Sequence, residues 1–164
     1  MKTMYVVRHA DSSWDTKFLN DFDRPLSNQG ISDVKKLAKL FINKNYLCDS
    51  IIHSSAIRTT QTANYLNQKL INNNPIKVSS EKFLYLAKID DVINILNCHI
   101  KQYNAIMYVG HNPTITQFVN YMSDASVDYM PTGAMAVIDL KHNKLLESSG
   151  KLIDFIYPKK LKFL

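Results

Sequence analysis

Short apolar runs alternate with segments of helical spacing along most of the chain, and this alternation constrains the fold more than any other feature. Apolar runs that stop at polar residues are typical of buried strands, whereas apolar residues three and four positions apart indicate helices. Strands that alternate with helices usually form a parallel sheet with helices on both faces. The predicted fold class is therefore α/β, a three-layer α/β/α sandwich with a mostly parallel central sheet.

The element boundaries follow from the same pattern. We expect strands at 5–7, 50–54, 76–79, 105–109, 134–140 and 152–157, the last of them at an edge of the sheet. Helices are expected after Ser27, which can cap the first of them, after Arg58 and before the break at 72–75, and from about 90 to 103. A fourth helix should start at Pro113 with Asn112 as its N-cap.

Length and composition limit the classes of protein to consider. A chain of 164 residues fits one domain over 1–164. No apolar run approaches the ~20 residues that cross a bilayer, and no signal-peptide core precedes the first strand. We therefore expect a cytoplasmic protein with no membrane partner. The net charge of +6 suits an anionic partner. Aromatic and basic residues are rarely interleaved in this sequence, so nucleic acid is not the expected partner. An acidic protein or a phosphorylated molecule fits better.

Basic residues and histidines follow three of the predicted strands. Arg8-His9 follows the first, the segment 54–58 with Arg58 follows the second, and Gly110-His111 follows the strand at 105–109. Taken alone, Arg8-His9 fits two interpretations equally well: a cation beside a nucleophile, or a surface ion pair at Arg8 followed by an ordinary loop histidine. Because the carboxyl ends of parallel strands lie at one edge of a sheet, these residues should meet in one crevice. Two guanidinium groups and two imidazoles there would bind an anion such as phosphate.

The residues available favour phosphoryl transfer by a histidine. The sequence has no carboxylate cluster or Cys/His spacing for a metal and no glycine-rich nucleotide loop, so no metal and no cofactor are expected. A histidine with an ordinary pKa of about 6.5 is largely neutral at pH 7 and can attack phosphorus. Guanidinium groups offset the charge on the phosphoryl oxygens in the transition state. The expected intermediate is a phosphohistidine on the enzyme.

Three blocks of the sequence are similar to signatures of the histidine phosphatase superfamily, which also contains the cofactor-dependent phosphoglycerate mutases. Arg8-His9-Ala10 resembles the Arg-His-Gly signature, with alanine where many relatives have glycine. The segment 54–63 resembles the second block, and 109–113 resembles the block with the second histidine. The resemblance spans most of the chain and implies a phosphoglycerate mutase-like fold.

The resemblance also implies the roles of four residues. His9 would be the catalytic nucleophile, and Arg8, Arg58 and His111 would complete the catalytic site and bind the substrate's phosphoryl group. Shorter motifs narrow the similarity to the compact SixA-like phosphohistidine phosphatases; these motifs are 12–15, 23–26, 84–85 and 131–133. That branch implies a phosphatase that acts on protein phosphohistidine, with an acidic phosphotransfer domain as partner.

The sequence departs from the resemblance at the expected position of the general acid. Relatives in the SixA-like branch often have a glutamate where this chain has Leu86, and the nearest carboxylate is Glu81, which is either a general acid or a surface residue. An alkoxide leaving group needs a proton, whereas imidazole is much less basic and leaves more easily. The sequence therefore favours protein phosphohistidine as substrate. Two alternatives stay open: a small-metabolite phosphomonoesterase that uses Glu81 or another carboxylate, and a module that binds phosphorylated partners without turnover.

Overall fold

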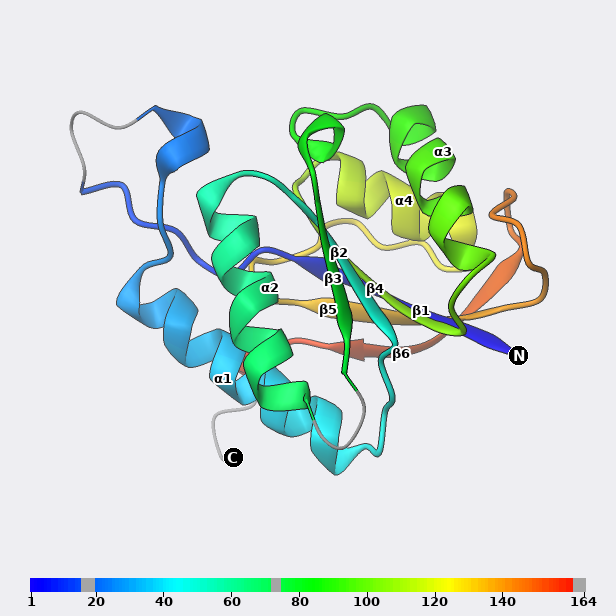
Figure 1. Ribbon diagram of the computed structural model, residues 1–164, viewed down its shortest axis with the longest axis horizontal. Helices are drawn as coiled ribbons and strands as arrows, with labels where there is room; N and C mark the ends of the chain where they lie inside the picture. The colour runs from blue at the N-terminus through cyan, green and yellow to red at the C-terminus, as the bar shows by residue number, and fades with distance from the viewer. Residues whose placement is uncertain (16–19, 72–74, 161–164) are drawn as a thin grey trace.

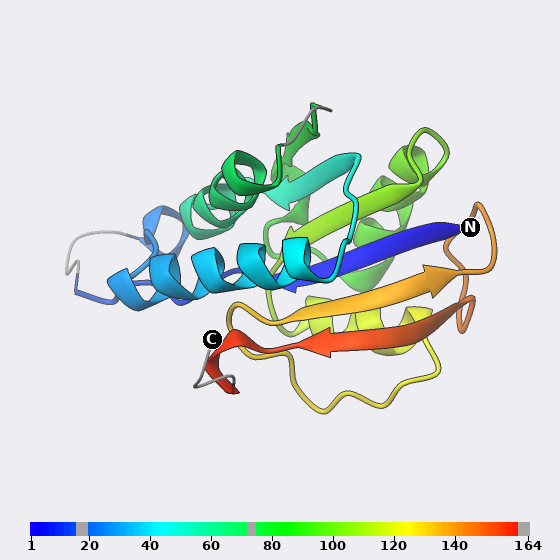
Figure 2. The ribbon, with the colours of Figure 1, turned by 90° about the horizontal axis from the view of Figure 1, so that it is seen from below.

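A single six-stranded sheet runs through the computed structural model, which describes residues 1–15, 20–71 and 75–160 (Figure 1). The order across the sheet is β3-β2-β4-β1-β5-β6. The four strands from β3 to β1 are parallel, and β5 and β6 continue the sheet antiparallel beside β1 (Figure 2). The strands are β1 (Lys2–Arg8), β2 (Ser50–Ser54), β3 (Lys77–Glu81), β4 (Ala105–Gly110), β5 (Met135–Leu140) and β6 (Gly150–Ile156).

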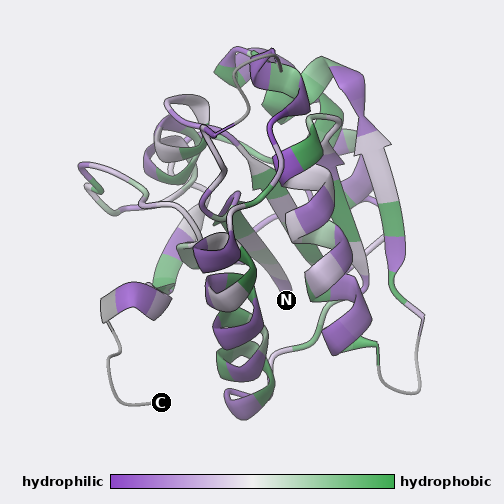
Figure 3. Cartoon of the chain, turned by 90° about the vertical axis from the view of Figure 1, so that its left-hand side faces the viewer, coloured by the Kyte–Doolittle hydropathy of each residue, from purple (hydrophilic) through white to green (hydrophobic). Residues whose placement is uncertain are grey.

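Helices cover both faces of this sheet, as the alternation predicts (Figure 1). The helices are α1 (Asn28–Asn43), α2 (Ile57–Leu70), α3 (Ile89–Ile100) and α4 (Thr114–Met122). The inner residues of α1 and α2 pack in one apolar cluster with one face of the strands, and those of α3 and α4 pack in a second cluster on the other face. The helices nearest the viewer in Figure 3 show hydrophilic and hydrophobic residues alternating along their length. The predicted α/β/α class is confirmed.

Local interactions account for where α1 begins. The Ser27 hydroxyl accepts a hydrogen bond of 3.0 Å from the backbone N–H of Gly30, as a serine N-cap should. The helix then buries Val34, Leu37 and Phe41. Gly30 lies so close to Asp11 that a Cβ atom at position 30 would be 2.1 Å from the Asp11 carbonyl oxygen. The start of α1 therefore packs directly against the chain that leaves β1.

The predicted cap of α4 is wrong. The N-cap is Pro113, and the helix begins at Thr114. The side chain of Asn112 makes other bonds: its Nδ2 donates to the Met130 carbonyl at 3.0 Å, and its Oδ1 accepts from the Thr116 hydroxyl at 2.7 Å. Because the local bond to Thr116 of α4 and the tertiary bond to Met130 use both polar atoms of the amide, Asn112 joins the start of α4 to the segment before β5.

Other boundaries differ by a few residues. α3 ends at Ile100 and not at 103. β3 extends beyond the predicted end at 79 to Glu81, which pairs with Ser54 of β2. The predicted break at 72–75 lies largely outside the described residues, as does part of the polar loop after β1. Within the described parts of the chain, no helix combines the length and apolar character that crossing a bilayer requires.

Candidate active site

The ends of β1, β2 and β4 lie side by side at one edge of the sheet. Arg8 pairs with Gly110, and the backbone N–H of His9 donates to the Gly110 carbonyl at 3.1 Å. The rings of His9 and His111 are consequently adjacent, with centroids 5.3 Å apart. The predicted meeting of the three strand ends is confirmed.

A cavity of about 330 Å³ opens at this edge. The four residues predicted from the sequence blocks all line it. The complete lining is Arg8, His9, Asp11, Ser12, Trp14, Arg24, Arg58, His111, Asn112 and Thr132. We call this space the phosphate cavity, because its size and its three arginines suit a tetrahedral anion.

The geometry of His9 leaves one ring nitrogen available as a nucleophile. Its Nδ1 lies 2.8 Å from the carbonyl oxygen of Ala10, and a carbonyl only accepts, so Nδ1 carries the proton. Nε2 then has a free lone pair. Burial, together with the charges of Arg58 and Arg8, lowers the pKa of His9 to about 3. The imidazole is therefore neutral throughout the physiological pH range.

His111 stands beside the nucleophile in a similar state. Its Nε2 is 2.7 Å from the hydroxyl of Ser54, at the end of β2. Tyr85 packs edge-on against the ring, with centroids 5.7 Å apart. Burial and the charge of Arg58 lower the pKa of His111 to about 4. The side chain is thus a neutral hydrogen-bonding group at physiological pH.

Each of the two predicted arginines is anchored at its tip. Arg8 donates from Nη1 to the Met130 carbonyl at 3.0 Å and also bonds the Tyr129 hydroxyl. Arg58 donates from Nη1 to the Asp21 carbonyl at 2.6 Å and from Nη2 to its carboxylate at 3.0 Å. These bonds fix the two guanidinium groups on the walls of the phosphate cavity.

Three buried polar atoms of the site have no hydrogen-bond partner among the described residues. They are Nε of Arg8, Nε of Arg58 and Nδ1 of His111. Buried N–H donors in native proteins are normally paired, because an unpaired one costs about 1–3 kcal/mol. A phosphoryl group supplies oxygen acceptors, so the unpaired arginine donors fit an anionic substrate.

Two further residues complete the site, and the sequence blocks assign no role to either. Asp21 bonds Arg58 and Arg24 with its carboxylate and also accepts from the Tyr85 hydroxyl at 2.9 Å. Arg24 donates to the Ser12 hydroxyl at 2.6 Å, and its guanidinium lies 3.2 Å from the centroid of the Trp14 ring. The sequence signals for them are the polar segment that contains both and, for Arg24, the motif at 23–26.

Trp14 packs at the surface of the site. The ring is 78% exposed and stacks on Arg24, so it does not anchor the loop in the core.

Neither candidate carboxylate is placed as a general acid. Glu81 ends β3, lines neither this cavity nor the one beside it, and lies 3.9 Å from His99 Nε2. Burial alone would raise the pKa of Asp21, but hydrogen bonds from Tyr85, Arg24 and Arg58 lower it to about 2. Asp21 is therefore an ionised acceptor at neutral pH and holds no proton to donate.

Because His9 and His111 are buried in the neutral form, we expect the protein to be less stable at acid pH. The pKa values of His9 and His111 lie below the unfolded value of about 6.5, so the unfolded state binds more protons below that pH. Each histidine should lower the free energy of unfolding by about 2 kcal/mol between pH 8 and pH 5. Urea unfolding at the two pH values measures this loss. A His9→Asn variant should lose about 2 kcal/mol less than the wild type, and an equal loss would contradict the assignment.

Comparison with known proteins indicates the same family as the sequence blocks. Residues 4–81 match the family model described as histidine phosphatase superfamily (branch 1). An uncharacterized chloroplastic protein of Arabidopsis thaliana is 30% identical over 133 residues, which are 77% of this chain and 61% of the relative. The chain therefore spans about three fifths of that relative's length.

Solved structures extend the comparison to nearly the whole chain. A protein from Agrobacterium tumefaciens assigned as the phosphohistidine phosphatase SixA has a TM-score of 0.82 and 26% identity, over 96% of this chain and 98% of that one. A protein histidine phosphatase SixA in complex with tungstate has a TM-score of 0.83 and 20% identity, over 98% and 99%. The histidine phosphatase family-model match and the strong structural similarity to SixA proteins confirm the resemblance that the sequence blocks indicate. The fold is that of the SixA proteins.

Proposed function

We propose that this protein is a phosphatase that transfers a phosphoryl group to His9 and then hydrolyses the phosphohistidine. The observation that carries the proposal is a neutral histidine with a free Nε2 lone pair beside two arginines whose buried Nε–H donors are unpaired. Such donors stabilise the charge on the three equatorial oxygens of a phosphoryl group during transfer. In this proposal, arginines do the work that a metal ion does in many other phosphatases.

The proposed reaction has two steps. In the first, Nε2 of His9 attacks phosphorus and the bond to the leaving group breaks, while the proton stays on Nδ1, which donates it in a hydrogen bond to the Ala10 carbonyl. Arg8 and Arg58 hold the phosphoryl oxygens throughout. In the second, water attacks phosphorus, the bond to His9 breaks, and inorganic phosphate leaves with the free imidazole restored. His111 bonds the phosphoryl group from the other side of the cavity.

The proposed substrate is a phosphohistidine residue on a protein. Glu81 lies outside the cavity and Asp21 is ionised, so neither of these two carboxyl groups stands ready to protonate an alkoxide. Imidazole is much less basic than an alkoxide and leaves without that help. The similarity to a protein histidine phosphatase SixA that binds tungstate, a tetrahedral oxyanion, supports the same choice.

A single-turnover trap tests the proposal. Excess enzyme is mixed with a protein carrying labelled phosphohistidine and quenched in alkali within milliseconds, and the label is located by peptide mass spectrometry. The label should appear transiently on His9 and be acid-labile, as a phosphoramidate bond is. Release of phosphate without label on any enzyme histidine would contradict the covalent mechanism. Tight binding of the phosphorylated protein with no release would instead indicate a binding module.

The choice of substrate needs a separate measurement. The value of kcat/KM for the phosphohistidine protein should exceed that for an alkyl phosphate such as glycerol phosphate. A clear preference for the alkyl phosphate would indicate a metabolite phosphomonoesterase.

A further inference from the structure

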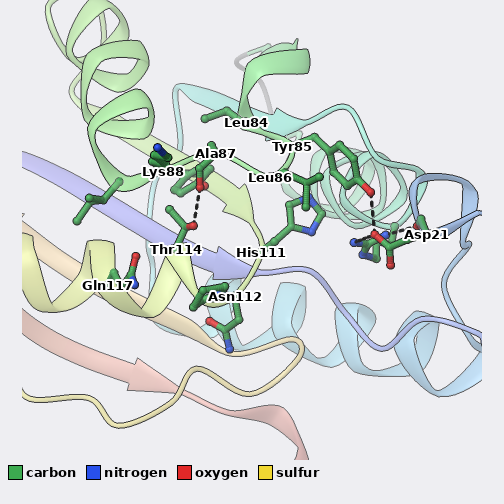
Figure 4. Close-up of a pocket in the computed structure, with 14 residues that line it drawn as sticks. Asp21, Leu84, Tyr85, Leu86, Ala87, Lys88, His111, Asn112, Thr114 and Gln117 are labelled. Atoms are coloured by element: carbon green, nitrogen blue, oxygen red, sulfur yellow. Dashed lines mark hydrogen bonds and ion pairs between the residues drawn. The ribbon is translucent and has the colours of Figure 1, made fainter.

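A second cavity of about 560 Å³ adjoins the phosphate cavity (Figure 4). It lies between the segment that follows β3 and the start of α4. Arg58, His111 and Asn112 line both cavities, whereas Arg8 and His9 line only the phosphate cavity. The full lining is Asp21, Arg58, Leu84, Tyr85, Leu86, Ala87, Lys88, Ile89, Tyr108, His111, Asn112, Pro113, Thr114 and Gln117.

The position of this second cavity relative to His9 matters for phosphoryl transfer. In an in-line displacement the nucleophile and the leaving group stand on opposite sides of phosphorus. When Arg58 and His111 hold a phosphoryl group, the nucleophile His9 approaches it from the phosphate cavity. The leaving group must then point away from His9, and the second cavity is lined by Arg58 and His111 but not by His9.

The walls of the second cavity are largely apolar. Leu84, Tyr85, Leu86 and Pro113 contribute carbon surface to this wall, and Figure 4 shows Tyr85 and Leu86 toward the end of the cavity where His111 lies. Leu86 is notable because its side chain is 81% exposed and its backbone has φ of 53°, a left-handed conformation that leucine seldom adopts. The backbone thus holds an apolar side chain at the open rim of the cavity.

Most polar groups of this wall are already bonded within the protein. The Thr114 hydroxyl donates to the Ala87 carbonyl at 2.7 Å, and the Tyr85 hydroxyl donates to Asp21. The amide of Asn112 bonds Met130 and Thr116. The side chains of Lys88 and Gln117 also line this cavity, and a flat ring would bury its carbon surface against the leucines, Tyr85 and Pro113.

We propose that the second cavity binds the leaving group, that this group is the imidazole ring of the substrate's phosphohistidine, and that Leu86 selects it by packing on the ring. The inference rests on the proposed function and names the residue that recognises the ring. During transfer the P–N bond to His9 forms as the P–N bond to the substrate ring breaks. The electron pair of the broken bond returns to the ring nitrogen, and a ring protonated on its other nitrogen leaves as neutral imidazole.

The test compares two phosphoryl donors that differ in the leaving group. A phosphohistidine peptide carries the ring, whereas phosphoramidate carries only an amino group and needs the phosphate cavity alone. Leu86→Asn removes the apolar contact, and asparagine accepts a positive φ more readily than leucine does. We expect kcat/KM for the peptide to fall about fivefold, which corresponds to about 1 kcal/mol. The value for phosphoramidate should change less than twofold.

Phe83→Asn is the matched control, because Phe83 is 67% exposed on the same segment and lines neither cavity. It should leave both donors unaffected, and thermal unfolding checks that each variant is folded. Equal losses on both donors, or no loss on the peptide, would overturn the role of Leu86. A wild-type enzyme that hydrolyses neither donor would instead overturn the proposed function itself.

Discussion

Replacing His9 with alanine should lower kcat/KM for a phosphohistidine protein by roughly 10⁴-fold or more, because the covalent step loses its nucleophile. No other described imidazole is placed to replace it: Nε2 of His111 faces the Ser54 hydroxyl. Rates of phosphate release under single-turnover conditions measure the loss, and the trapped phosphoenzyme should disappear with it. The variant should still bind tungstate or phosphate, since the arginines remain.

His142→Ala is a suitable control for this experiment. His142 is exposed in the turn between β5 and β6, at the end of the sheet opposite the candidate site, and should be dispensable for activity. A His9→Ala protein that keeps more than a tenth of the wild-type rate would refute the proposed nucleophile.

Replacing Arg58 with alanine should lower kcat/KM by about 10³-fold, the scale on which an arginine contributes to phosphoryl transfer. Arg58→Lys keeps the charge but should recover only part of the loss. A lysine cannot bond the Asp21 carbonyl, the Asp21 carboxylate and the phosphoryl oxygens together, as the guanidinium fork can. Steady-state kinetics with the phosphohistidine protein measure both variants, and inhibition by tungstate should weaken in parallel.

Lys101→Ala separates this effect from a general loss of charge. Lys101 is exposed between α3 and β4, at the far end of the sheet, so its loss changes the net charge equally without touching the candidate site. Full activity of Arg58→Ala, or an equal loss in Lys101→Ala, would contradict the role given to Arg58.

Residues at the strand ends could be predicted because sheet topology brings them together. Parallel order places the residues after β1, β2 and β4 at one edge, whatever the loops between them do. The sequence therefore predicts that Arg8, His9, Arg58 and His111 meet, and they line one cavity. The three layers of the fold were equally predictable, because the spacing of apolar residues differs between helices and strands and so identifies each element.

Loop residues of the site could not be predicted in the same way. Asp21 and Arg24 reach Arg58 and Ser12 through a polar loop that has no periodicity to place it. Asn112 has the residue type of a helix cap, but its side chain bonds Thr116 within α4 and makes a tertiary bond to Met130. Glu81 is near Leu86 in sequence, yet its position at the end of an edge strand directs it to His99.

The bonds around Asp21 have a consequence for how the family can change. One carboxylate joins Arg24, Arg58 and Tyr85, and each of the three is held partly by that group. Substitutions at these positions should therefore not be additive, because the first one already releases the partners of the others. Homologues that lack the carboxylate are expected to differ at the partner positions as well. The positions of Asp21, Arg24, Arg58 and Tyr85 would then vary together across an alignment. A substitution at one of them would be tolerated only when the others change as well.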